Sequence, residues 1–179
     1  MQKPSVNRSS STFFESAFRG ATTVFATAVL WGGLSHWLYA NGESPGGPTP
    51  FENHFEVQRW LILPVLLFAW AGFCSVLWLV CGRGSLSTSP GVWFESLGGI
   101  YGNGYMLCWV LPDAVAYGLM DMQGLRALAP VLPLLTTGFI GFLSFQFVVR
   151  RVQMHKGRIG LGVLLAWTLQ SIPLLFLIR

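Results

Sequence analysis

Three polar side chains lie inside long apolar stretches of this sequence: Asp113, His36 and Gln170. A carboxylate within a membrane helix costs at least ~2.5 kcal/mol on insertion scales and persists mostly where it faces a partner or a water-filled cavity. At about 1.5 Å per residue from the outer end of each apolar stretch, His36 lies ~6 Å deep, Asp113 ~9 Å and Gln170 ~12 Å. Residues of these types in one layer predict a hydrogen-bonded site that relays protons or small solutes.

A structural role for Asp113 is the alternative. The side chain can stay neutral and bond a carbonyl that Pro112 frees, or the hydroxyl of Tyr117, four residues on and on the same helix face. Asp113 and Tyr117 also continue a stripe of residues spaced four apart, which either packs against a neighbouring helix or lines a groove. The other members of that stripe are Tyr101, Tyr105 and Trp109.

Five apolar stretches must position these side chains, at residues 20–40, 60–81, 97–119, 127–149 and 159–178. Each is long enough to cross a hydrocarbon core of ~30 Å as a helix, and only 10% of the 179 residues are charged. Because lipid offers no hydrogen bonds to the backbone, spans of this length are helical. We therefore expect an all-α, polytopic transmembrane bundle of five spans in residues 20–179. A cytoplasmic tail, residues 1–19, precedes it with a short interfacial helix that bends at Gly20 into the first span.

The basic residues indicate the orientation of the bundle. Eight of the 11 Lys and Arg residues precede the first stretch or lie in the segments 82–96 and 150–158, and three lie on the other side. The positive-inside rule then places the N-terminus inside and the C-terminus outside. The segment 150–158 either binds anionic lipid head groups or only fixes this topology. Its cations are Arg150, Arg151, Lys156 and Arg158.

Small residues predict where helices approach one another. Gly98-x-x-x-Gly102 has the spacing that lets two helix backbones come close, and the fourth stretch offers Gly138 and Gly141. We expect these four glycines to serve helix packing.

The sequence contains no string that signals an enzyme. The phosphate-loop, G-x-S-x-G and H-E-x-x-H patterns are absent, and no apolar stretch besides the first carries a histidine to oppose His36 across a haem. Cys74, Cys81 and Cys108 form no C-x-x-C pair and suit small apolar positions. We expect no catalytic activity, no metal and no cofactor. Nucleic acid is not an expected partner, because the basic residues form short flanks without a stacking platform beside them.

The segment GRGSLSTSPGVWFESLGGIYGNGYMLCWVLPDAV, with Gly98, Gly99, Tyr101, Tyr105 and Pro112, resembles the Yip-domain family of five-span membrane proteins. The resemblance covers the layout from about Trp60 to Arg179. It implies a cytoplasmic N-terminus, a Gly/Ser-containing inner loop before the third span and a polar-spotted last half. The Asp-Leu-Tyr-Gly-Pro signature of the eukaryotic members does not occur, so the likeness is to the prokaryotic type.

The sequence therefore predicts a non-enzymatic, multi-pass protein of a bacterial-type inner (plasma) membrane, Yip-like or an accessory subunit. Its expected partners are the lipid bilayer and other membrane protein subunits. The alternative is a small transporter or channel component that uses the polar layer around Asp113, with Pro112 and Pro173 as helix breaks.

Overall fold

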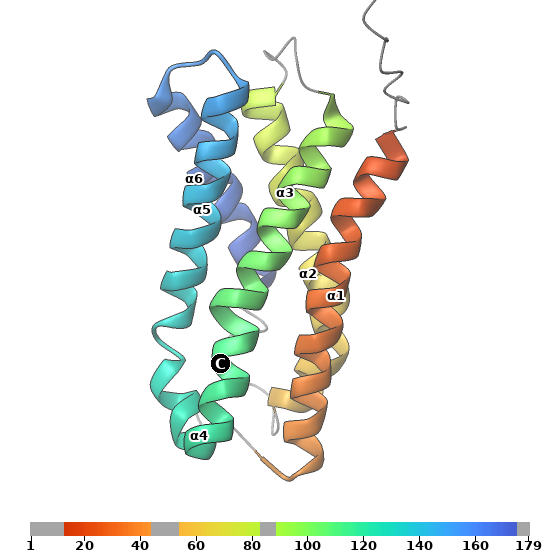
Figure 1. The fold of residues 1–179 in the computed structure, drawn as a ribbon, viewed down its shortest axis with the longest axis vertical. Helices are drawn as coiled ribbons and strands as arrows, with labels where there is room; N and C mark the ends of the chain where they lie inside the picture. Colours follow the sequence, from red (N-terminus) through yellow and green to blue (C-terminus); the bar gives the residue numbers. More distant parts are fainter. Residues whose placement is uncertain (1–12, 44–53, 83–88, 175–179) are drawn as a thin grey trace, which may run out of the picture.

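The computed structural model describes residues 13–43, 54–82 and 89–174, and within these ranges the chain forms five helices and no strand (Figure 1). The prediction of an all-α fold is confirmed for this part of the chain. The second helix ends in a π-helical turn, η1, and a second π-helical turn, η2, joins the two halves of the third helix. The elements are α1 (Phe13–Ala40), α2 (His54–Leu77), η1 (Trp78–Gly82), α3 (Pro90–Tyr105), η2 (Met106–Val110), α4 (Leu111–Leu128), α5 (Leu132–Arg151) and α6 (Lys156–Leu174).

The helices run alternately up and down the long axis of one bundle (Figure 1). α1 packs against α2 and α3, α6 packs against α2 and α5, and α3 packs against α5. The end of the bundle at which α1 begins also holds the connection from α5 to α6, whereas α1 ends and α2 begins at the opposite end (Figure 1).

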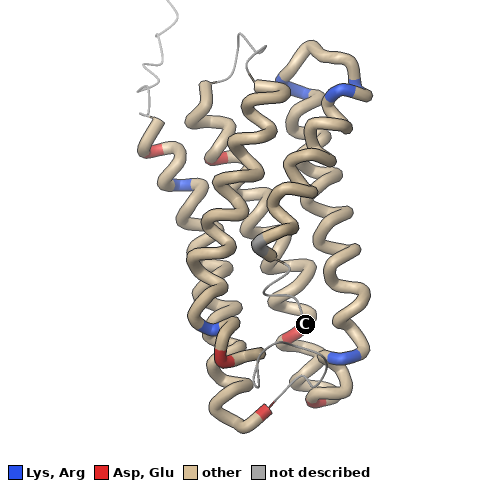
Figure 2. Tube along the Cα trace, turned by 180° about the vertical axis from the view of Figure 1, so that it is seen from behind, with Lys and Arg blue, Asp and Glu red and all other residues tan. Residues whose placement is uncertain are grey.

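The outer surface of the bundle is apolar along its length. Lys, Arg, Asp and Glu gather toward the two ends of the bundle, as Figure 2 shows. Large apolar side chains project outward between these ends, and Phe68 and Leu134 are each 74% exposed. By length and composition, two of the described helices, His54–Gly82 and Leu132–Arg151, are able to cross a membrane. The other three spans stay predictions.

The first helix differs from its expected form. α1 continues through Gly20 without a break, so residues 13–19 extend this helix and form no separate interfacial one. Gly20 has a different use: a Cβ there would lie 2.5 Å from the Phe94 carbonyl oxygen of α3. The glycine is needed for close packing and not for a bend. Residues 1–12 of the predicted tail lie outside the described residues.

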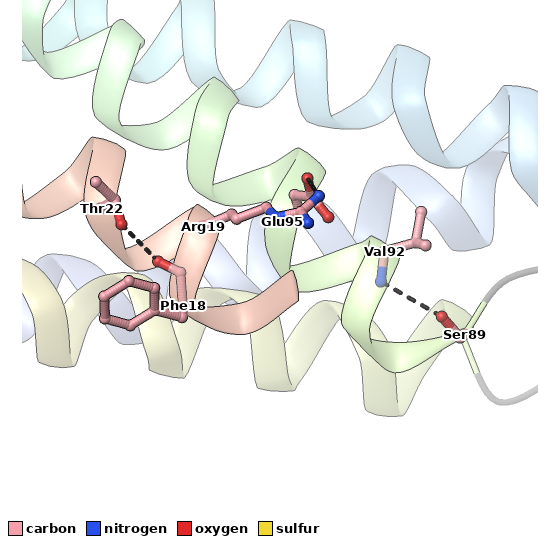
Figure 3. A network of polar contacts seen from close by, with 6 residues as sticks. All are labelled: Phe18, Arg19, Thr22, Ser89, Val92 and Glu95. Carbon is pink, nitrogen blue, oxygen red and sulfur yellow. Dashed lines mark hydrogen bonds and ion pairs between the residues drawn. The ribbon is translucent and has the colours of Figure 1, made fainter. Parts of the chain in front are cut away.

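The third helix accommodates its proline with irregular backbone. Ser89 caps α3, since its hydroxyl accepts a hydrogen bond from the Val92 N–H at 3.4 Å (Figure 3). The π-helical turn η2 ends at Val110, two residues before Pro112, which lacks the N–H that a regular helix would use. Further on, Asp121 has φ 52° and ψ −145°, which kinks α4.

Candidate functional site

Asp113 is buried near the start of α4, with 3% of its surface exposed. The two groups predicted as its structural partners have other contacts. The Tyr117 hydroxyl donates to Glu43 Oε1 at 3.0 Å, and the Cys108 carbonyl, four residues before Pro112, accepts from Thr136 Oγ1 at 3.4 Å. Thr136 lies on α5, so this bond also joins two helices at the proline.

Gln170 is buried on α6, and its Oε1 accepts a hydrogen bond from the Tyr101 hydroxyl of α3. Tyr101 belongs to the stripe of residues spaced four apart, whose rings lie in the core of the bundle. The ring centroids of Tyr101 and Tyr105 are 5.0 Å apart, and those of Tyr105 and Trp109 are 6.3 Å apart. The Trp31 ring of α1 is tilted against that of Trp109, with centroids 5.2 Å apart. Tyr101, Tyr105 and Trp109 of the stripe therefore pack inside the bundle, and Gln170 is held against them.

His36 lies elsewhere, on an exposed face of α1. Its Nδ1 is 3.1 Å from Nη1 of Arg59, which α2 contributes. The structure thus places His36 on the surface with Arg59, and Gln170 in the core with Tyr101. These contacts do not join His36 to Gln170, and the shared layer predicted for Asp113, His36 and Gln170 stays a prediction.

Arg59 is the residue that sequence reasoning missed, because it was counted only as an outer charge. Its guanidinium lies over the Tyr39 ring at 4.1 Å and over the Trp60 ring at 5.4 Å, and its Nη2 lies 3.8 Å from Glu56 Oε1. The signal available in the sequence was a lone arginine at the edge of an apolar stretch, directly before a tryptophan. Such a pattern is typical of a cation held at a membrane interface.

The four predicted packing glycines have unlike surroundings. A Cβ at Gly98 would lie 2.5 Å from Gly20 Cα, and a Cβ at Gly102 would lie 2.9 Å from Thr23 of α1. Thr27 adds a hydrogen bond, since its hydroxyl lies 3.0 Å from the Gly102 carbonyl oxygen. These two glycines are thus used within the chain. Gly141 has only Val163 at 4.0 Å, and Gly138 has nothing within 4 Å.

The predicted basic segment lies where α5 ends and α6 begins. All four cations are exposed, and the Arg151 guanidinium lies 5.3 Å from the Phe147 ring centroid. An ion pair near the start of α1, between Arg19 and Glu95 at 3.6 Å, joins α1 to α3 (Figure 3). The exposed cations are Arg150, Arg151, Lys156 and Arg158.

Two grooves and one cavity lie beside these residues. A groove of ≈ 420 Å³ between α1 and α2 includes His36 and Arg59 in its lining, and a second groove of ≈ 420 Å³ includes Pro112 and Gly138. A smaller cavity of ≈ 130 Å³ lies beside Trp109, Thr136 and Ser171. Within residues 13–43, 54–82 and 89–174, no group of three or more His, Cys, Asp or Glu side chains is placed to hold a metal ion.

The fold and these sites define an all-helical bundle with apolar surface grooves and a polar contact at the rim of one of them. Comparison with family models, with curated proteins and with solved structures finds no match to this chain.

Proposed function

We propose that the protein is a non-enzymatic, multi-pass protein of a bacterial-type inner membrane that acts by packing against another membrane protein. All five helices cross the bilayer in this proposal, with the N-terminus in the cytoplasm. The resemblance to the Yip-domain family is part of the proposal, and it supports the layout of the spans.

The surface chemistry supports a membrane location. Large apolar side chains such as Phe68, Phe142 and Leu164 are exposed between the charged ends of the bundle. A soluble monomer rarely exposes a contiguous apolar surface of this kind, whereas lipid covers it without cost. The basic segment 150–158 lies at the end of the bundle where α1 begins, which agrees with a cytoplasmic position for both.

The proposal of a protein partner depends on the groove that Gly138 lines. Since no atom of another element lies within 4 Å of a Cβ at Gly138, the surface is hollow there. A glycine in a hollow lets the backbone of a second transmembrane helix approach closely. The occupant is a transmembrane helix of another membrane protein. The groove is lined by Leu107, Cys108, Pro112, Leu134, Leu135, Gly138 and Phe139.

Co-purification from native membranes in mild detergent tests the partner. Gly138→Leu fills the groove, and Gly72→Leu is its matched control, because a Cβ at Gly72 also meets nothing within 4 Å but lies on α2. We expect wild type and Gly72→Leu to retain a stoichiometric membrane partner and Gly138→Leu to lose it. A wild-type protein that appears only as a monomer in native mass measurements would overturn the partner proposal.

Cysteine labelling from one side of the membrane tests the topology. In a background with Ser in place of Cys74, Cys81 and Cys108, single cysteines replace Asn41 and Gln153. A membrane-impermeant thiol reagent added outside the cells should label position 41 and leave position 153 unlabelled until the membrane is opened. Equal labelling of both positions would contradict the proposed arrangement.

A transporter or channel component is the second candidate, favoured by one observation. Asp113 is a buried carboxylate that directly follows Pro112 and lies three residues after a π-helical turn, and such turns occur frequently at functional sites. Proton flux into liposomes that contain the purified protein tests it. Flux that Asp113→Asn abolishes and the control Asp121→Asn preserves would favour this candidate over the first.

A further inference from the structure

The groove between α1 and α2 is apolar along most of its length and polar at one end. Gly32 and Gly33 line the α1 side. A Cβ at Gly32 would lie 3.1 Å from the Ile62 side chain of α2, whereas a Cβ at Gly33 would meet nothing within 4 Å, so the slot is open at Gly33. The walls are Ala28, Val29, Ile62 and Leu63, and Trp60 lies beside the polar end. A slot of this shape on the outside of an apolar bundle suits a hydrocarbon chain.

The polar end presents hydrogen-bond donors. An arginine guanidinium only donates, so the contact with Arg59 makes His36 Nδ1 the acceptor and leaves the ring proton on Nε2. The five N–H groups of the Arg59 guanidinium outnumber its contacts with His36 and Glu56. The slot therefore ends in N–H donors from a cation and from an imidazole.

Charge at this end favours an anion. The Arg59 side chain is only 17% exposed, and the Tyr39 and Trp60 rings hold its guanidinium in place. Glu56 compensates this charge weakly, because its carboxylate is 3.8 Å away and half exposed. The N–H groups of an arginine guanidinium can form two parallel hydrogen bonds with the oxygen atoms of a phosphate.

We propose that this groove binds one anionic phospholipid, with the phosphate on Arg59 and His36 and an acyl chain along Gly32 and Gly33. The inference rests on the membrane location proposed above and is independent of the partner helix, which would occupy the other groove. The lipid would fill the open side of α1 and bridge α1 to α2.

The experiment uses the full-length protein in detergent and measures lipid retention by native mass spectrometry and thermal stability by a melting curve. The probes are phosphatidylglycerol, phosphatidylcholine with the same chains, and glycerol phosphate without chains. We expect phosphatidylglycerol to be retained and to raise the melting temperature, and the other two to do so weakly. Arg59→Gln should weaken phosphatidylglycerol retention about tenfold or more, because it removes charge-assisted hydrogen bonds.

Gly33→Leu separates the chain from the head group. This change fills the slot without touching another element, so it should also abolish retention, whereas the control Gly72→Leu should not. Equal retention of both phospholipids by wild type and Arg59→Gln would overturn the proposal, since it would mark nonspecific lipid. Stabilisation by glycerol phosphate that Gly33→Leu leaves intact would overturn it as well, in favour of a free anion. Flotation of wild type with liposomes tests the membrane location separately, so failure of that proposal is distinguishable.

Discussion

Gly98 of α3 and Gly20 of α1 meet at a close helix crossing, where a methyl group added to Gly98 would lie 2.5 Å from the Gly20 Cα. The next residue, Gly99, has the opposite surroundings, because a methyl group there would meet nothing within 4 Å. The crossing continues along both helices, from Gly91 against Ser16 to Gly102 against Thr23. Gly98 is therefore a buried position at which to test the helix crossing, and the neighbouring Gly99 is its control.

Gly98→Ala should lower the free energy of unfolding by about 1–3 kcal/mol, because the methyl group forces two backbones apart. Gly99→Ala should leave stability unchanged or raise it by up to ~1 kcal/mol, the gain in helix propensity. SDS titration in mixed micelles measures both. Equal effects of the two substitutions would show that α1 and α3 do not cross here.

Asp121→Gly should stabilise the protein. The φ of 52° with ψ of −145° lies in a region that is nearly restricted to glycine and costs a side-chain-bearing residue on the order of 1–3 kcal/mol. Part of that gain is offset by the greater freedom of glycine in the unfolded chain, so we expect about 1 kcal/mol net. Asp121→Ala keeps the Cβ and is the control. If the alanine variant gains as much as the glycine variant, removal of the carboxylate explains the effect and backbone strain does not.

Apolar periodicity was sufficient to predict five helices, because each apolar stretch exceeds the length of a strand and contains no alternation. It set the ends less well. α1 begins by Phe13, and the third helix passes its kink at Asp121 before it ends at Leu128, so both helices extend beyond the apolar stretches that mark them. Both glycines of the pattern Gly98-x-x-x-Gly102 lie against α1, but a glycine motif carries no information about which helix it meets.

The partners of the polar side chains were harder to predict, because the sequence of one helix does not show which neighbouring helix a side chain meets. Depth from the outer end of each apolar stretch predicts one layer for His36 and Gln170. Depth leaves undetermined the direction in which each side chain projects around its helix axis. His36 projects outward beside Arg59, and Gln170 projects inward to Tyr101. Gly20 likewise suited both a bend and a close contact, and only the position of α3 distinguishes them.

Thr136→Val should destabilise the protein through Pro112. The proline has no N–H for the Cys108 carbonyl four residues earlier. The Thr136 hydroxyl of α5 donates to the Leu132 carbonyl at 2.8 Å and shares this donor with the Cys108 carbonyl at 3.4 Å. Hydrogen bonds between membrane helices average ~0.6 kcal/mol and reach ~1.7 kcal/mol, and we expect a loss in this range. In a Pro112→Ala background the helix regains its own donor, so Thr136→Val should then cost less. Purely additive losses in this double-mutant cycle, within about 0.5 kcal/mol, would show that Thr136 does not serve the proline.

Tyr101→Phe should cost about 1–3 kcal/mol, because it leaves the buried Oε1 of Gln170 without the donor seen here. The reason is desolvation: both side chains are almost fully buried, and the Gln170 amide nitrogen already has no partner among the described residues. Gln170→Leu in the Tyr101→Phe background should therefore recover most of the loss, since it removes the orphaned amide and fills the same space. Unfolding measured for both single variants and the double variant gives the coupling. A double variant as unstable as the sum of the two single variants would mean that this bond does not join α3 to α6.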